Sequence, residues 1–317
     1  MLWRQGMNNV SALDRRYPVR REAKAGLWQR IRKNWMAYVF ISPFFILYSI
    51  FGLFGLLFSL YLSFHHWDGL TAMKFRGAGN YTELFQDELF WLSIRNTLLL
   101  LLFDFPLKVG LPLLLAVALN SKLVRGRGLF RTGFYVPEVT SAVVVAIIFR
   151  YLFDRDTGMV NYALNAFGLD SIAWLQDPFW AKVSFVLLSG WWSQGYHMVI
   201  FLAALQTIPQ DLLEAAMVDG ANQVQSFWRI TLPLLRPIII FSAIITTTAG
   251  FQRFAEPFLL TSGGPGYSTY TILYYLYQKT FVSYRLGYGA AMGYVVFVMI
   301  FVFSLAQFRY GSKGWRE

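Results

Sequence analysis

Long apolar segments, separated by short polar ones, dominate the chain. Residues 36–64, 183–206 and 287–308 run for 29, 24 and 22 residues without a charged side chain. A helix needs about 20 apolar residues to cross a bilayer, so each segment predicts a membrane span. Residues 97–120, 132–153 and 232–258 are also long and apolar. These three carry charges inside or near the apolar run: Asp104, Lys108, Glu138, Arg150, Arg253 and Glu256. The pattern predicts an all-α membrane protein whose domain, residues 35–308, contains six spans.

A polar insert, residues 209–233, separates the fourth and fifth apolar segments. Its first half is apolar on one side at helical spacing: Leu212, Leu213, Ala216 and Met217. Glu214 projects from another side. Pro209 suits the first turn of such a helix, and Gly220 can adopt the left-handed conformation that ends it. We expect this helix, followed by a second short amphipathic one over 222–229, to lie at the membrane surface with Glu214 facing outward.

Composition and charge agree with a membrane protein. The chain is 56% hydrophobic and 14% charged, whereas soluble domains average about 25% charged residues. With the N-terminus in the cytoplasm, the inside segments hold eighteen Lys and Arg residues and the outside loops hold five. The positive-inside rule therefore predicts a basic cytoplasmic tail over 1–34 and a cytoplasmic C-terminal tail over 309–317. Because the basic residues flank spans and form no stripe on a soluble face, the net charge of +11 does not indicate nucleic-acid binding.

Few residues favour enzymatic chemistry. The chain has no cysteine, which excludes disulfides, thiol catalysis and cysteine-ligated metals. His65 and His66 could bind metal or move protons, but adjacent residues on a helix do not share a face, so an interfacial cap is favoured. No Gly-x-x-x-x-Gly-Lys-Ser/Thr sequence occurs. We expect no metal, no cofactor and no catalytic residue in this chain.

The polar insert also carries a recognisable motif. Glu214-Ala215-Ala216 and Gly220, followed by Ile230-x-Leu232-Pro233, resemble the EAA loop of permease subunits in bacterial ABC importers. The resemblance implies the type I ABC importer permease fold, in which this loop is a cytoplasmic coupling helix that docks on an ATPase. ATP and Mg would then be bound by the partner ATPase. The residues assigned to ATPase coupling are Glu214, Ala215, Ala216, Asp219, Gly220, Ile230 and Pro233.

Other segments narrow the resemblance to carbohydrate-type importers, similar to the permeases of maltose and glycerol-phosphate uptake. They are Asn80-Tyr81, residues 125–131, Trp174-Leu175 with Asp177-Pro178, and residues 260–266. The resemblance implies a multi-pass subunit of the bacterial inner membrane that imports a saccharide from the periplasm by alternating access. Its implied partners are a companion permease in a heterodimer, two ATPase subunits and a periplasmic solute-binding protein. A permease for a non-sugar substrate, or an ion-driven secondary transporter, is the alternative.

The third outside loop contains Thr261, Gly263, Gly264, Pro265 and Gly266. By resemblance this loop faces the binding protein and reaches toward its sugar cleft. The sequence is also typical of a plain tight loop, because glycine permits positive φ and proline ends helices. Both interpretations stay open at this point.

Polar and aromatic residues interrupt the fourth and fifth spans. Beside Thr246 and Thr247, the candidates for the substrate pathway are Trp191, Trp192, Gln194, Tyr196, His197, Thr248, Gln252, Arg253 and Glu256. Aromatic rings can stack on sugars, and Gln and Thr can exchange hydrogen bonds with hydroxyl groups. The alternative is that these residues only join helices.

The charges within the spans bear on the kind of saccharide. Asp104 and Lys108 lie four residues apart, and Arg253 and Glu256 lie three apart, so each pair is expected to neutralise itself on one helix face. If Arg253 instead faces the pathway without its partner, it favours an anionic ligand such as a uronate oligosaccharide.

Overall fold

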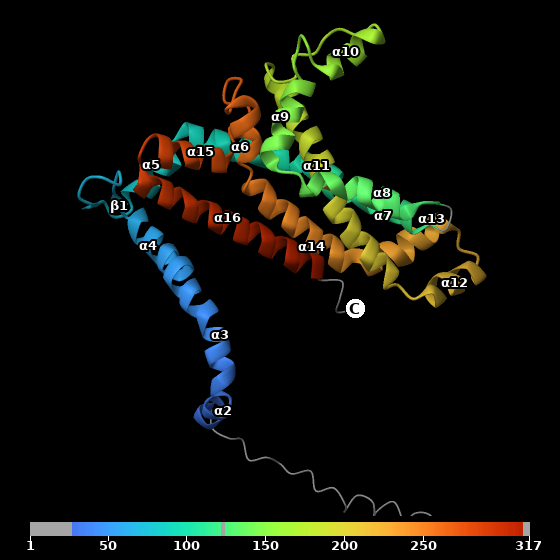
Figure 1. Ribbon diagram of the computed structural model, residues 1–317, viewed down its shortest axis with the longest axis horizontal. Helices are drawn as coiled ribbons and strands as arrows, with labels where there is room; N and C mark the ends of the chain where they lie inside the picture. The colour runs from blue at the N-terminus through green and yellow to red at the C-terminus, as the bar shows by residue number, and fades with distance from the viewer. Residues whose placement is uncertain (1–26, 122–123, 313–317) are drawn as a thin grey trace, which may run out of the picture. The chain divides into compact units, whose positions relative to one another are not determined.

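The structure is a computed structural model that describes residues 27–121 and 124–312 (Figure 1). It divides into two compact units, one up to Phe58 and one from Ser59 onward. The helices of the first unit are α2 (Leu27–Lys33), α3 (Trp35–Leu47), the π-helical η1 (Tyr48–Leu53) and the start of α4 (Phe54–Ser63). Neither α3 nor η1 has a buried side chain. The continuous helix Trp35–Ser63 is long and apolar enough to cross a membrane.

The second unit begins with a feature that the helical pattern did not predict. Strands β1 (His65–His66) and β2 (Lys74–Phe75) form an antiparallel hairpin. Because strand side chains alternate, His65 is buried, with Nδ1 2.8 Å from the Tyr61 carbonyl oxygen, while His66 is exposed. The two histidines therefore point to different environments.

The second predicted span is a single long helix, Glu88–Asn120. It follows α5 (Gly79–Gln86) and consists of α6 (Glu88–Phe105), the π-helical η2 (Pro106–Gly110) and α7 (Leu111–Asn120). A proline removes one backbone donor from the helical ladder, and the π-helical turn begins at Pro106. The turn places Asp104 and Lys108 on the inner side, where both are buried.

The third predicted span, 132–153, is not one straight helix. The chain forms α8 (Arg127–Tyr135) and the 3₁₀ turn η3 (Val136–Val139), then bends by 98° into α9 (Ala142–Leu152). Thr140 and Ser141 have ψ values of 139° and 137°, outside the helical region. Pro137 also lacks the N–H that a continuing helix requires. We correct this span to a bent pair that carries Glu138 beside the bend.

The fourth span is α11 (Pro178–Gln206), which follows the short helix α10 (Met159–Ala166). Asp177 caps α11 by accepting hydrogen bonds from the backbone N–H groups of Phe179 and Trp180. After a 69° bend, α12 (Gln210–Val218) begins.

The fifth span differs from its predicted bounds, 232–258. The helix starts earlier, because α13 (Gln223–Ser226), the π-helical η4 (Phe227–Thr231) and α14 (Leu232–Phe251) are continuous over Gln223–Phe251. It also ends earlier, at Phe251, and Gln252 is the C-cap. Arg253 and Glu256 thus lie beyond the helix, in a segment that leads to the π-helical η5 (Pro257–Thr261).

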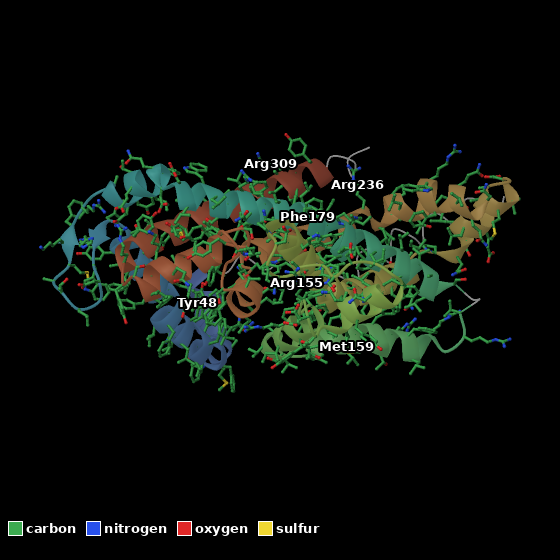
Figure 2. The ribbon with its side chains drawn as sticks, turned by 90° about the horizontal axis from the view of Figure 1, so that it is seen from above. Tyr48, Arg155, Met159, Phe179, Arg236 and Arg309 are labelled. Atoms are coloured by element: carbon green, nitrogen blue, oxygen red, sulfur yellow. The ribbon has the colours of Figure 1, made fainter. Side chains whose placement is uncertain are left out.

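The last described elements are α15 (Ile272–Tyr277), the π-helical η6 (Gln278–Val282) and α16 (Leu286–Ser312). Helices α14 and α16 pack together, with Gly311 against Ile240 and a hydrogen bond from Gln307 Nε2 to Thr247 Oγ1. Arg236 on α14 and Arg309 on α16 consequently lie at the same end of this helix pair (Figure 2). Among the described residues, four helices can cross a membrane, or six if each bent pair is one span.

Three apolar clusters hold the second unit together. The first joins α5, α6, α14, α15 and α16 around Phe90 and Tyr275. The second joins α7, α11 and α14 around Phe201 and Leu235. The third joins α6, α9, α11 and η5 around Phe185. Helices α6, α11 and α14 each contribute to two of the three clusters, so they pack around the polar groups between them.

Candidate functional site

The first helix predicted in the polar insert forms, as α12. None of its side chains is buried, and Val218 is 89% exposed. In Figure 1, α12 and its connection project from the end of α11 and α14. Glu214 is exposed. A helix with this much uncovered apolar surface is typical of an interaction site.

The end of α12 has the geometry of a Schellman motif. Gly220 has φ of +83°, its N–H donates to the Met217 carbonyl, and the Ala221 N–H donates to the Ala216 carbonyl. Pro209 lies one residue outside the helix, as its N-cap, so the predicted place of this proline in the first turn is wrong by one residue. The second predicted helix begins at Gln223 with a capping box between Asn222 and Gln225. It continues without a break into the span that contains Ile230 and Pro233.

A buried group of charges joins three elements inside the second unit. Arg253 Nη2 donates to Asp104 Oδ2 and, at 2.8 Å, to Ser189 Oγ on α11. Ser189 Oγ in turn donates to Asp104 Oδ1 at 3.3 Å. Lys108 Nζ lies 3.4 Å from Asp104, and Arg253 Nε lies 3.6 Å from Glu256. We call these five residues the charge cluster.

The charge cluster modifies the predicted pairing. Both predicted ion pairs exist, but Arg253 pairs across helices with Asp104 and is only 4% exposed. An Arg253 without its partner was the condition for an anionic ligand, and this condition is not met. The expectation of an anionic ligand therefore loses its support from Arg253.

A cavity of about 260 Å³ lies beside the charge cluster. Its lining contains polar groups from η2, η3, α11 and α14: Lys108, Glu138, Ser193, Tyr196, His197 and Thr246, with Ile245 and Ala249. His197 Nδ1 and Ser242 Oγ are 2.7 Å apart, so this histidine is both hydrogen-bonded in the core and part of the cavity wall. The cavity can offer donors and acceptors to a polar ligand.

Several predicted pathway residues lie outside this lining. Trp192 packs against the third apolar cluster, and Trp191, 43% exposed, contacts the Phe149 ring at 5.3 Å between centroids. Thr248 donates to the Ile244 carbonyl of its own helix. Gln252 is exposed, while Gln194 is partly buried. Arg253 and Glu256 belong to the charge cluster.

Sequence reasoning assigned no cavity role to Lys108, Glu138 or Ser193. Glu138 had a usable signal, because a carboxylate in an apolar segment is costly and marks functional candidates. Its placement depends on the bend after η3, which the pattern did not predict. Ser193 gave no distinctive signal.

The glycine-rich loop after η5, predicted to lie outside, forms a compact, internally bonded turn. Thr261 Oγ1 and Thr269 Oγ1 are 2.7 Å apart, and Thr269 Oγ1 donates to the Gly264 carbonyl. Gly263 has φ of +84°, and an added Cβ would overlap the Tyr270 and Tyr274 rings. Gly264 and Pro265 are joined by a cis peptide bond. Gly263 thus serves the turn itself, whereas Gly266 and Tyr267 are exposed.

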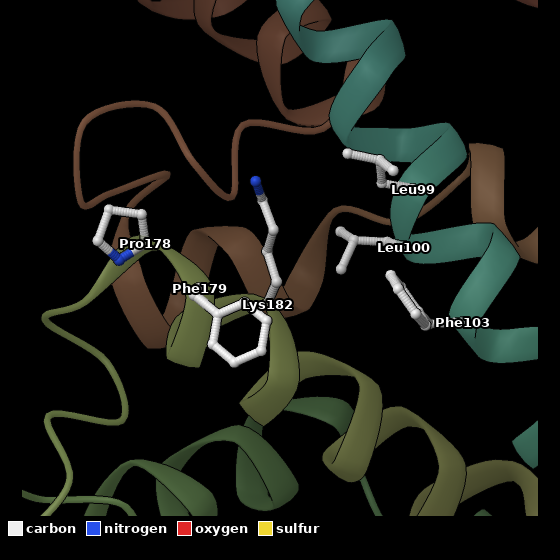
Figure 3. Close-up of a pocket in the computed structure, with 6 residues that line it drawn as sticks. All are labelled: Leu99, Leu100, Phe103, Pro178, Phe179 and Lys182. Atoms are coloured by element: carbon white, nitrogen blue, oxygen red, sulfur yellow. The ribbon is translucent and has the colours of Figure 1, made fainter.

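A second cavity, of about 340 Å³, lies between α6 and the start of α11. Figure 3 shows its lining of Leu99, Leu100, Phe103, Pro178, Phe179 and Lys182. It contains none of the predicted pathway residues and is mainly apolar. We therefore take the cavity beside the charge cluster as the candidate ligand site.

Outside the spans, Asp87 is a polar junction between α6, α15 and α16. Tyr275 and Tyr288 donate to Asp87 Oδ2, and Lys279 Nζ lies 3.9 Å away. Burial raises the pKa of this carboxyl, but the two hydrogen bonds and Lys279 outweigh burial, so its pKa is below the ordinary value. The junction joins the N-terminal ends of α6 and α16 to α15.

Comparisons with known proteins agree with this architecture. Residues 108–313 match the family described as "Binding-protein-dependent transport system inner membrane component". The chain is 41% identical to the probable ABC transporter permease protein YesP of Bacillus subtilis, covering 89% of this chain and 92% of YesP. It is 38% identical to the lactose transport system permease protein LacF of Rhizobium radiobacter, covering 86% and 92%.

A solved structure also supports the assignment to a permease family. The chain superposes on a chain of a bacterial ABC transporter involved in the import of the acidic polysaccharide alginate with a TM-score of 0.77 and 29% identity, covering 91% and 99%. This likeness and the helical spans confirm the predicted all-α permease fold of the type I importers. The chain is therefore a multi-pass member of the binding-protein-dependent transport system inner membrane component family, an ABC importer permease of the carbohydrate type.

Proposed function

We propose that this chain is the permease subunit of an ATP-driven importer that moves a saccharide from the periplasm to the cytoplasm by alternating access. The observation that carries the proposal is α12, a capped helix without buried side chains that presents Glu214 outward. Such a helix is a suitable contact for a separate ATPase, because its exposed surface is available to a partner. ATP and Mg would be held by that ATPase.

The saccharide is supported by the relatives and by the cavity. Relatives include the lactose permease and an arabinooligosaccharides permease of Halalkalibacterium halodurans, 37% identical over 85% of this chain. Hydroxyl groups of a sugar can exchange hydrogen bonds with Tyr196 and Thr246 in the cavity wall. A neutral sugar, lactose, and an acidic polysaccharide, alginate, are named for proteins to which this chain is similar.

The remaining partners follow from the same proposal. A second permease, identical or different, would complete the path, and we favour a heterodimer. A periplasmic solute-binding protein would deliver the sugar, as the alginate transporter was solved with an alginate pentasaccharide-bound periplasmic protein. The exposed Gly266 and Tyr267 are available to contact such a protein. The protein would lie in the inner membrane, with both termini in the cytoplasm.

The test is uptake by the reconstituted assembly in proteoliposomes. Radiolabelled lactose, arabinotriose and a guluronate trisaccharide serve as probes, with ATP inside the vesicles and binding protein outside. We expect uptake of at least one probe to require ATP, the ATPase and the binding protein together. Uptake that persists without the ATPase and responds to an ion gradient would instead identify a secondary transporter.

A further inference from the structure

Two polar atoms in the cavity beside the charge cluster lack a hydrogen-bond partner although both are shielded from solvent. They are Glu138 Oε2 on η3 and Thr246 Oγ1 on α14. Thr246 is 1% exposed, and both residues line the same cavity. A buried acceptor without a partner destabilises the protein unless something in the cavity bonds to it. The Glu138 carboxylate can accept a hydrogen bond and the Thr246 hydroxyl can accept or donate one, so these atoms indicate a ligand with hydroxyl groups.

The charges around the cavity decide what sort of ligand fits. Lys108 and Glu138 are the charged residues of the lining, and behind Lys108 lie Asp104, Arg253 and Glu256 of the charge cluster, in which Arg253 Nη1 has no hydrogen-bond partner among the described residues. Arg253 is held by Asp104 and Glu256, and Lys108 lies against Asp104. Glu138 is within electrostatic range of Lys108, yet no ion pair between them forms at 4 Å or less. With all five ionised, the net charge of this set is negative, so a second carboxylate in the cavity would be repelled.

We propose that this cavity is a subsite for one uncharged sugar ring, whose hydroxyl groups bond to Glu138, Lys108 and Thr246, and that it disfavours a uronate ring. This inference rests on the proposed function and specifies the substrate class at that site. A sugar hydroxyl can donate to the Glu138 carboxylate and accept from the Lys108 ammonium group at once.

The size of the cavity supports a single ring. Ligand pockets for drug-sized molecules span roughly 300–1,000 Å³. A volume of about 260 Å³ falls just below that range. The cavity therefore suits part of an oligosaccharide, and the Tyr196 ring in its wall can cover one face of the sugar.

The absence of cysteine from this chain allows a direct test. Ala249→Cys places one thiol in the cavity wall of the complete importer, and the importer with the natural chain gives the background from its partners. A cationic and an anionic methanethiosulfonate reagent are then compared for their rates of thiol modification. We expect the cationic reagent to modify the thiol faster than the anionic one. Glu138→Gln should lower the ratio of the two rates about tenfold, because it removes one nearby charge in a region of low dielectric.

Protection by sugars is the second measurement. Lactose or arabinotriose should slow modification of the Ala249→Cys thiol, whereas a guluronate trisaccharide should not. Thr246→Val should weaken that protection several-fold. Thr248→Val is the matched control, because its hydroxyl bonds within its own helix and it does not line this cavity.

Each outcome bears on the proposal. Equal rates for the two reagents, a preference for the anionic one, protection by the guluronate probe, or protection by no sugar would overturn the subsite. If the importer with Glu138→Gln does not assemble, the loss of sugar protection in Thr246→Val still tests the subsite. Failure of the proposed function would appear elsewhere, as saccharide uptake that does not need ATP, and would leave the reagent preference unchanged.

Discussion

Asp104 and Arg253 form a buried ion pair although 149 residues separate them in the sequence. The pair joins α6 of the second span, two residues before the π-helical turn η2, to the segment that follows the fifth span. Ser189 adds the fourth span by bonding to both side chains. Thr271 Oγ1 also donates to the Arg253 carbonyl at 2.7 Å, which fixes the backbone on the other side. The contact therefore fixes how these three spans pack.

Asp104→Asn should destabilise the assembled importer strongly. The substitution leaves Arg253 and Lys108 buried with one carboxylate fewer, and loss of one partner from a buried pair costs about 3–5 kcal/mol. The thermal midpoint of the detergent-solubilised assembly measures the effect. The double variant Asp104→Leu with Arg253→Met should recover part of the loss, because it removes both charges. The loss of stability in the double variant is compared with the summed losses of Asp104→Leu and Arg253→Met measured singly. A loss as large as that sum would contradict the pairing.

Close packing of α8 against α11 depends on Gly195. A Cβ at this position would overlap the backbone of Phe134 and Tyr135, whereas a Cβ at Gly133 meets nothing within 4 Å. We expect Gly195→Ala to lower the free energy of unfolding by about 1–3 kcal/mol. Gly133→Ala, in a helix with open space, should be neutral or raise it by up to about 1 kcal/mol. The thermal midpoints of the two variants measure these changes. Equal shifts would disprove the close contact between Gly195 and the backbone of α8.

The sequence predicted the positions of the helices better than the contacts between them. Apolar length located the spans, because a bilayer requires it, and the motif around Glu214 located α12 and its glycine cap. The bend after Val139 and the early end of α14 at Phe251 escaped the pattern, since hydropathy does not record where a helix breaks. Those two breaks bring Glu138 to the cavity and Arg253 to Asp104. Contacts between distant segments, such as Asp104 with Arg253, have no signature in local spacing.

Stability of the junction around Asp87 should depend on pH. Its pKa is below the ordinary value of 3.8, so the folded state favours the carboxylate. The stabilisation is fully present above pH 3.8 and is lost as the pH falls through the lowered pKa. Acid should therefore lower the thermal midpoint of unfolding. Asp87→Asn should lower the midpoint at neutral pH, and the midpoint of this variant should vary less with pH. Glu88→Gln, which removes the next carboxylate and leaves the Asp87 contacts intact, should retain the dependence.

Glu214 allows a direct test of coupling between the permease and the ATPase, because its exposed side chain is not needed for folding. The residue is exposed on α12, a helix without buried side chains, so Glu214→Gln should change the free energy of unfolding by less than about 0.5 kcal/mol. If the carboxylate pairs with a basic residue of the ATPase, its loss costs roughly 2–5 kcal/mol at the interface, which corresponds to a fall of about thirtyfold or more in binding.

We expect ATP-driven uptake and co-purification of the ATPase to fall together in Glu214→Gln, while the thermal midpoint of the isolated permease stays the same. Asp211→Asn is the matched control, since it removes another exposed carboxylate from the same helix, near its N-terminus, at a cost of about 0.3–1 kcal/mol to the helix. If both variants lose uptake equally, the helix acts through its overall charge and not through one pair. If Glu214→Gln retains uptake and ATPase binding, α12 does not couple through this carboxylate, and the contact must lie in the apolar side chains such as Met217 and Val218.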